Sequence, residues 1–121
     1  MSIFKNKPLN ERKQEVENMM TKFPGKVPII LEKYASSQNV VMDKEKYLVP
    51  GEITVGEILY MFRKRIKLEA TQALFVFFNK DMAATNMTMK QVYDKYKNKD
   101  DGMLYATYGG ENTFGGETIF G

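Results

Sequence analysis

Few residue types in this sequence can support covalent catalysis. The 121 residues include no Cys and no His, which excludes cysteine nucleophiles, Ser-His-Asp triads and His-based zinc sites. Serine occurs only at positions 2, 36 and 37, and none of the three stands in a Gly-x-Ser-x-Gly setting. Carboxylates remain as candidates for acid–base catalysis, but no pair of them stands out. The inventory predicts a protein that is not an enzyme and that holds no metal ion.

The last eleven residues, ENTFGGETIFG, form the most unusual pattern in the chain. Glycine follows phenylalanine twice, at Phe114-Gly115 and at Phe120-Gly121. Glycine loses more conformational freedom than any other residue when it becomes ordered, so we expect residues 109–121 to form a flexible tail. A glycine-rich terminus is most often only a frayed end, and a functional reading needs support from the domain that precedes it.

The composition is that of one folded domain. Hydrophobic residues make up 43% of the chain and charged residues 27%. No apolar run approaches the roughly 20 residues that span a bilayer, and the N-terminus has no signal-peptide core, so we expect a soluble, non-secreted protein. The net charge of +3 is weaker than that of a dedicated nucleic-acid binder, but it suits contact with acidic partners or anionic lipid headgroups.

Helical spacing predicts a first helix over residues 9–23. Val16, Met19, Met20 and Phe23 fall at i, i+3, i+4 and i+7, and Asn10 is a candidate N-cap. Taken alone, this apolar face is more typical of a core than of a binding site.

Two further helices are predicted over residues 54–67 and 88–96. Each begins with a capping box, Thr54 with Glu57 and Thr88 with Gln91. The basic run RKRIK near the end of the first of them could indicate nucleic-acid binding. A solvated helix end, where cations suit the helix dipole, explains it better.

Four segments are predicted as strands: KVPIILEKY (26–34), KYLVPGE (46–52), ALFVFFN (73–79) and MLYATY (103–108). Pro50 favours an edge position for the second strand. The continuous apolar run of the third is typical of a strand buried on both faces, so we place it at the centre of the sheet, covered by the helix 54–67 and by the N-terminal helix.

The order of these elements predicts an α+β fold on the β-grasp plan of ubiquitin, with a four-stranded mixed sheet. The predicted parts are an N-terminal helical extension (1–24), the β-grasp domain (25–108) and the Gly-rich tail (109–121).

Longer stretches of the sequence match one family in order and spacing. They are FPGKVPIILEK (23–33), KYLVPGEITVGEILYMFRKRIKL (46–68), ALFVFFN, TMKQVYDKY and LYATYGGENTFG. Over roughly residues 8–115 the chain resembles the autophagy ubiquitin-like modifiers, the family of GABARAP and light chain three. Met103 departs from the pattern, because the family often has phenylalanine there.

The resemblance implies a conjugation reaction at the tail. Family members end, after processing, in an aromatic residue followed by glycine, and activating and conjugating enzymes join that glycine to the amine of phosphatidylethanolamine. No cofactor is implied, because the enzymes supply the catalytic cysteines. Two alternatives stay open: Gly115 after Phe114, exposed by a processing and delipidating cysteine protease, or Gly121 after Phe120, which needs no cleavage. The matching position favours Gly115.

The resemblance also implies a groove for acidic peptides with an aromatic-x-x-aliphatic motif, carried by cargo receptors and adaptors. The peptide would add as a strand beside residues 46–50, pairing with the backbone of Lys46 and Leu48. Lys44, Lys46 and Arg65 would meet its acidic residues. The aromatic pocket would comprise Glu15, Met19, Pro28, Ile30, Lys46, Leu48 and Met103. The aliphatic pocket would comprise Tyr47, Val49, Pro50, Ile53, Ile58, Met61 and Arg65.

The expected places of action are the cytoplasm, the autophagosome membrane through the lipid, and the vacuole or lysosome after fusion, with no nucleic-acid partner. A second hypothesis, from a different class, is an unconjugated trafficking or cytoskeletal adaptor that uses only the groove. An enzyme ranks last.

Overall fold

The computed structural model describes residues 3–33, 45–66 and 73–110. In chain order the elements are η1 (Phe4–Asn6), α1 (Leu9–Lys22), β1 (Lys26–Lys33), β2 (Lys46–Pro50), α2 (Val55–Ile66), β3 (Leu74–Phe78), α3 (Met89–Tyr96) and β4 (Leu104–Gly110). The strands form one mixed sheet in the order β2-β1-β4-β3, with β1 and β4 parallel and the other neighbours antiparallel. The predicted fold class is confirmed.

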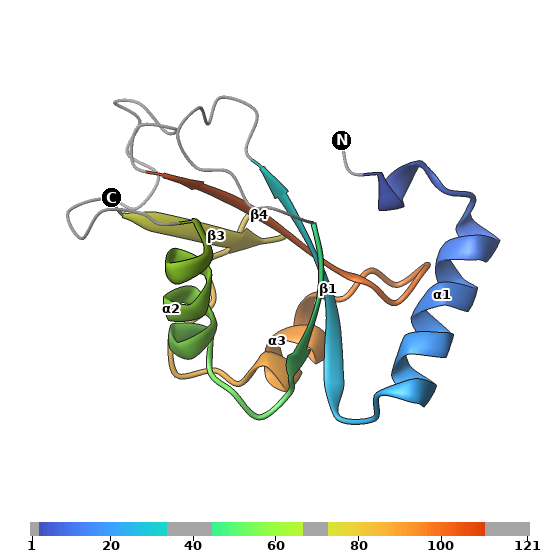
Figure 1. Ribbon diagram of the computed structural model, residues 1–121, viewed down its shortest axis with the longest axis horizontal. Helices are drawn as coiled ribbons and strands as arrows, with labels where there is room; N and C mark the ends of the chain where they lie inside the picture. Colours follow the sequence, from blue (N-terminus) through green and yellow to red (C-terminus); the bar gives the residue numbers. More distant parts are fainter. Residues whose placement is uncertain (1–2, 34–44, 67–72, 111–121) are drawn as a thin grey trace.

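Helices cover both faces of this sheet. Figure 1 shows α2 and α3 on one face and α1 on the other. Successive side chains of a strand point to opposite faces, and β1 supplies both cores: Ile29 and Leu31 belong to the larger core under α2 and α3, and Ile30 to the smaller one under α1. The smaller core consists of Phe4, Val16, Ile30 and Met103, with Met19 and Tyr105 packed against it.

The prediction that segment 73–79 is the central strand is wrong. In the described part of the chain β3 pairs only with β4 and forms an edge of the sheet, and α1 packs against β1 instead. The strand buried on both faces is β1, whose residues 27–31 are all buried. In β3, Val76 and Phe78 lie in the larger core, whereas Leu74 and Phe75 are only half-buried. A continuous apolar run therefore does not require a strand at the centre of the sheet.

Helix α1 also differs in detail from the prediction. Its N-cap is Pro8, with no side-chain hydrogen bond, and Asn10 lies inside the helix. Val16 is buried, but Met20 and Phe23 are 36% and 40% exposed, so only part of the predicted apolar face is core.

The two capping boxes are confirmed. The Thr54 hydroxyl accepts from the Glu57 N–H, and the Glu57 carboxylate accepts from the Thr54 N–H, both at 3.2 Å. Thr88 and Gln91 make the same reciprocal pair at the start of α3. Local capping therefore sets where both helices begin.

Strand β4 runs two residues further than predicted. Gly109 and Gly110 are buried and pair with Phe75 and Leu74, so they belong to the sheet and not to the tail. The rest of the predicted tail, with both Phe-Gly pairs, lies outside the described residues, as do Lys44 and most of the predicted loop 35–46. None of the helices in the described part is long and apolar enough to cross a bilayer.

Candidate functional site

The pairing of β2 with β1 decides which way the backbone of β2 points. At one end the Leu31 N–H donates to the Glu45 carbonyl at 2.8 Å, and at the other the Gly51 N–H donates to the Gly25 carbonyl at 2.9 Å. Antiparallel strands alternate between hydrogen-bonded and non-hydrogen-bonded pairs. In this register the odd-numbered residues of β2 are therefore the ones that bond to β1.

The even-numbered residues Lys46 and Leu48 consequently direct their backbone N–H and C=O groups away from β1. Pro28, opposite Leu48, stands in a non-hydrogen-bonded pair, so its missing N–H costs this ladder no bond. Within the described ranges β2 has no second neighbour. Its outer side therefore offers donors and acceptors to an added strand, at the two residues that the family resemblance implied.

The residues predicted for the aromatic pocket come together on the α1 face of this edge. Lys46 lies opposite Ile30 and Leu48 opposite Pro28, so these four side chains share one face. Met103 joins Ile30 in the smaller core, and Met19 of α1 packs against them. Ile30 and Met103 are both 0% exposed, so in this arrangement the floor of the pocket is closed.

Glu15 links α1 to this edge. Its carboxylate accepts from Lys46 Nζ at 2.6 Å and from Lys7 Nζ at 3.0 Å. Burial acts to raise the pKa of Glu15, but the hydrogen bonds from Lys46 and Lys7 outweigh it and hold the pKa below its ordinary value. Both lysines lie more than 40% exposed, so solvent screens the attraction.

The lowered pKa of Glu15 gives a pH-dependent contribution to stability. A carboxyl whose pKa is lower in the folded state stabilises the fold above its ordinary pKa, here 4.5, and loses that contribution as the pH falls through the folded value. Glu15→Gln should therefore reduce the free energy of unfolding at pH 7 by about 0.5 kcal/mol, with the deficit vanishing in acid. Urea unfolding between pH 2 and 7 measures this. Glu17→Gln, an exposed change of the same charge on α1, is the control, and an equal deficit in both variants would contradict the prediction.

The residues predicted for the aliphatic pocket lie mainly on the opposite face. Tyr47, Val49 and Ile58 are buried in the larger core. The Tyr47 ring lies 5.6 Å from that of Phe62, and the Arg65 guanidinium lies 5.4 Å from the centre of the Tyr47 ring. These four core residues of β2 and α2 thus form a packed wall, with Arg65 at its exposed rim.

Of the other members of this set, Pro50 and Met61 lie apart from the wall. Ile53 packs against the larger core, but strand alternation puts Pro50 on the α1 face with Leu48. Met61 is 48% exposed and faces a different, open hollow of about 580 Å³. The residues that line this hollow are Thr54, Gly56, Glu57, Tyr60, Met61, Thr85 and Asn86. Apart from Met61, the sequence indicated none of them as a site.

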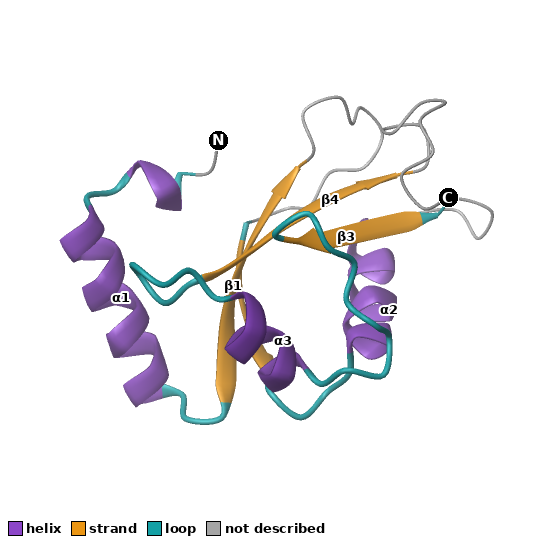
Figure 2. Cartoon of the chain, turned by 180° about the vertical axis from the view of Figure 1, so that it is seen from behind, coloured by secondary structure: helices purple, strands orange, loops and turns teal. Residues whose placement is uncertain are grey.

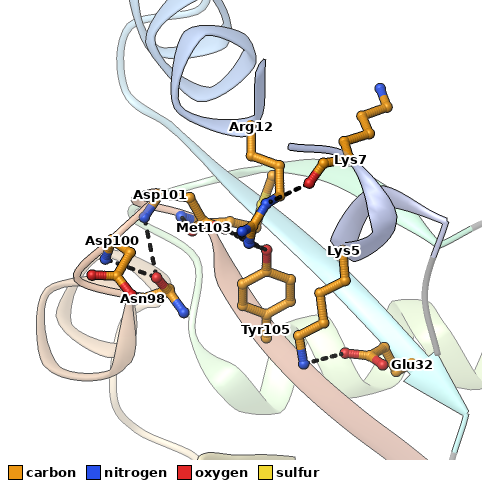
Figure 3. A network of polar contacts seen from close by, with 9 residues as sticks. All are labelled: Lys5, Lys7, Arg12, Glu32, Asn98, Asp100, Asp101, Met103 and Tyr105. Carbon is orange, nitrogen blue, oxygen red and sulfur yellow. Dashed lines mark hydrogen bonds and ion pairs between the residues drawn. The ribbon is translucent and has the colours of Figure 1, made fainter. Parts of the chain in front are cut away.

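A buried carboxylate beside the aromatic pocket escaped the sequence analysis (Figure 3). The Asp101 side chain is 0% exposed and accepts from Arg12 Nη1 at 2.7 Å, from the Tyr105 hydroxyl at 2.5 Å and from the Met103 N–H at 2.8 Å. Burial and the hydrogen bond to Asp101 raise the pKa of Tyr105, so its phenol stays protonated and donates. Nothing in the local pattern points to this cluster, because Arg12 and Asp101 are 89 positions apart.

In the ranges that the structure describes, acidic side chains do not gather in groups that could hold a metal ion. What the site offers is an open strand edge flanked by two apolar regions and by cations. These features suit the addition of an extended acidic segment as a further strand.

Comparison with known proteins identifies the family. The family described as "Autophagy protein Atg8 ubiquitin like" matches residues 11–115. Autophagy-related protein 8 of Kluyveromyces lactis is 44% identical over 120 residues, covering 98% of this chain and 96% of that protein. Autophagy-related protein 8a of Arabidopsis thaliana is 44% identical over 119 residues, covering 98% and 97%.

The fold agrees with a solved structure. The crystal structure of Trypanosoma brucei ATG8 superposes with a TM-score of 0.85 at 38% identity, covering 95% of this chain and 99% of that one. With the sheet topology, the family match and the relatives in agreement, the chain belongs to the autophagy-related Atg8 family of ubiquitin-like proteins.

Proposed function

We propose that this protein is a modifier that is joined through a C-terminal glycine to phosphatidylethanolamine and acts in autophagosome formation. The observation that carries the proposal is the family match, whose last matched residue is Gly115. This end point favours Gly115 over Gly121 as the working terminus. The lipid amine would displace the enzyme thiol from a thioester of the glycine, forming an amide. Glycine suits the formation of the thioester and that of the amide, because no side chain crowds its carbonyl.

The chain lacks the cysteines that this cascade needs, so its partners would supply them. An activating and a conjugating enzyme would carry the glycine as a thioester. A cysteine protease would cut between Gly115 and Gly116 and later release the lipid. A lipid with two acyl chains gives stable attachment where a single chain is marginal, so the conjugate would reside on autophagosome membranes and the free form in the cytoplasm. Fusion would carry part of it to the vacuole or lysosome.

Once on a membrane, the protein would recruit cargo receptors through the β2 edge. The outward backbone of Lys46 and Leu48 supports strand addition, and the two apolar regions support two anchor side chains. Burying one large anchor contributes about 1.5–3 kcal/mol. Two anchors and the strand pairing, less the ordering cost, give about −8 kcal/mol, or roughly micromolar affinity.

Mass spectrometry of the C-terminal peptide tests the conjugation. Trypsin cleaves after Lys99, the last cation of the chain, so one peptide reports the whole tail. From the membrane fraction of starved cells we expect this peptide to end at Gly115 and to carry phosphatidylethanolamine. The lipid on Gly121 would make the second Phe-Gly pair the working terminus. An unmodified tail in every fraction would instead favour the soluble adaptor that uses only the groove.

Substitutions at the β2 edge test peptide binding. Lys46→Ala and Leu48→Ala should weaken binding of an acidic aromatic-x-x-aliphatic peptide, and Leu48→Pro should weaken it about fivefold or more, because proline removes an outward N–H. The fold should survive Leu48→Pro, since that N–H does not bond to β1. Isothermal titration calorimetry gives the affinities. Lys90→Ala on α3 is the control, and unchanged binding in all three edge variants would reject this site.

A further inference from the structure

The floor of the aromatic pocket is covered by the N-terminal part of the chain. Ile30 and Met103 are fully buried, under Val16 and Met19 of α1 and Phe4 of η1. An aromatic side chain of a peptide therefore reaches this floor only after part of the cover has moved. Moving this cover thus costs free energy that the peptide-bound form must offset.

Apolar contacts hold α1 only weakly. All of its residues are described, and Val16 alone among them is buried. A helix with so little buried surface depends on its polar contacts to stay seated. One of these is the exposed pair of Glu15 with Lys46, which an acidic peptide would compete for at Lys46.

A second polar contact is the cluster that Arg12 and Tyr105 form around the buried carboxylate of Asp101, which we call the latch (Figure 3). Arg12 projects from α1 and donates through Nη1 to Asp101 and through Nε to the Lys7 carbonyl, at 2.7 and 3.1 Å. Asp101 lies in the turn between α3 and β4, and Figure 2 shows this turn reaching across to α1. The latch therefore fastens the first turns of α1 to the body of the domain.

The latch is bonded directly to the pocket floor. The carboxylate of Asp101 accepts from the N–H of Met103, and Tyr105 is the Cα partner of Ile30 in the parallel pair of β1 and β4. The turn also packs closely on α1: Gly102 has a φ of +77°, and a Cβ there would lie 3.3 Å from Val16. A shift of α1 thus strains the same residues that form the floor.

We propose that Arg12, Asp101 and Tyr105 are positioning residues that set how often α1 swings away and opens the aromatic pocket. The proposal rests on peptide binding at the β2 edge. The latch favours the closed form, so the measured affinity is the intrinsic affinity reduced by the fraction of molecules in the open form. None of the three residues needs to contact the peptide. Loosening the latch raises the affinity, and it does so only for peptides whose anchor enters this pocket.

A cycle of protein and peptide variants tests this. The full-length wild type, Arg12→Gln and Tyr105→Phe are titrated with an acidic aromatic-x-x-aliphatic peptide and with the same peptide carrying alanine in place of the aromatic residue. Lys13→Gln, the loss of the neighbouring exposed cation, is the control. Hydrogen exchange of the α1 amides without peptide measures opening by itself. Tyr105→Phe removes only the hydroxyl, with its bonds to Asp101 and Arg12, and keeps the test available if Arg12→Gln does not fold.

We expect Arg12→Gln to bind the aromatic peptide about three- to tenfold more tightly, Tyr105→Phe to change it less in the same direction, and neither to change binding of the alanine peptide. Protection of the α1 amides should fall in the same order. An equal change for both peptides, or an unchanged or weaker affinity for the aromatic one, would overturn the latch alone. If neither the wild type nor the variants bind the aromatic peptide, peptide binding at this edge fails, and the role of the latch with it.

Discussion

Asp101→Ala should reduce the free energy of unfolding by about 2–3 kcal/mol, a large fraction of the total for a domain of this size. The substitution leaves Arg12 beside the turn without its buried partner, at 19% side-chain exposure, and removes the acceptor for both the Tyr105 hydroxyl and the Met103 N–H. The buried Met103 N–H is then left unpaired, which costs more than the bond itself contributes, whereas Arg12 keeps its bond to the Lys7 carbonyl. Urea denaturation followed by circular dichroism measures the change.

The neighbouring Asp100 provides a matched control. Its side chain is exposed, and its backbone N–H, which bonds to the Asn98 side chain at 2.8 Å, is kept in Asp100→Ala. Both substitutions remove one negative charge from the same turn. Asp100→Ala should therefore change the free energy of unfolding by no more than about 0.5 kcal/mol. Comparable losses in the two variants would mean that the charge of the turn matters, and that the buried bonds of Asp101 do not.

Gly115→Ala should reduce the lipid-linked form to background. The methyl group of alanine lies next to the carbonyl that must be cleaved, activated and transferred, and it narrows the backbone conformations open to that residue. Gel mobility and mass spectrometry of membranes from starved cells measure the conjugate. The substitution lies beyond β4, which ends at Gly110, so the stability of the domain should not change.

Two further variants separate the alternatives at the tail. Gly121→Ala should leave conjugation intact if Gly115 is the working terminus. A chain that ends at Gly115 should be conjugated even where the processing protease is absent. If Gly121→Ala abolishes the conjugate and Gly115→Ala does not, the assignment of the terminus is reversed. Full conjugation of the double variant Gly115→Ala, Gly121→Ala would reject the proposed reaction altogether.

Local sequence signals predicted most of the helices and strands. Thr54 and Thr88 begin helices because capping is a property of four consecutive residues, and Pro50 marks an edge because proline has no N–H to donate. The prediction for β3 failed because the apolarity of one strand does not indicate which strands lie beside it. Sheet order depends on contacts between segments far apart in the chain, which no local pattern contains.

Local sequence signals predicted only part of the candidate site. The resemblance supplied the residues of the two pockets, and the structure adds their geometry. The outward direction of the Lys46 and Leu48 backbones follows from a register that only the paired strands define. The closed floor at Ile30 and Met103, and Asp101 beside it, depend on how α1 docks on the sheet. Periodicity and composition do not indicate such contacts between side chains that are far apart in the sequence.

Because Gly109 and Gly110 belong to β4, they shorten the segment that would connect the domain to a lipid on Gly115. Gly115 is the fifth residue after the end of the strand, and a fully extended chain of five residues spans at most about 18 Å. Lys46 begins β2 at the same end of the sheet at which β4 finishes. If the proposed conjugation holds, a receptor docked along β2 would therefore be held within a few nanometres of the lipid surface, and the strand itself would bring cargo and membrane close together.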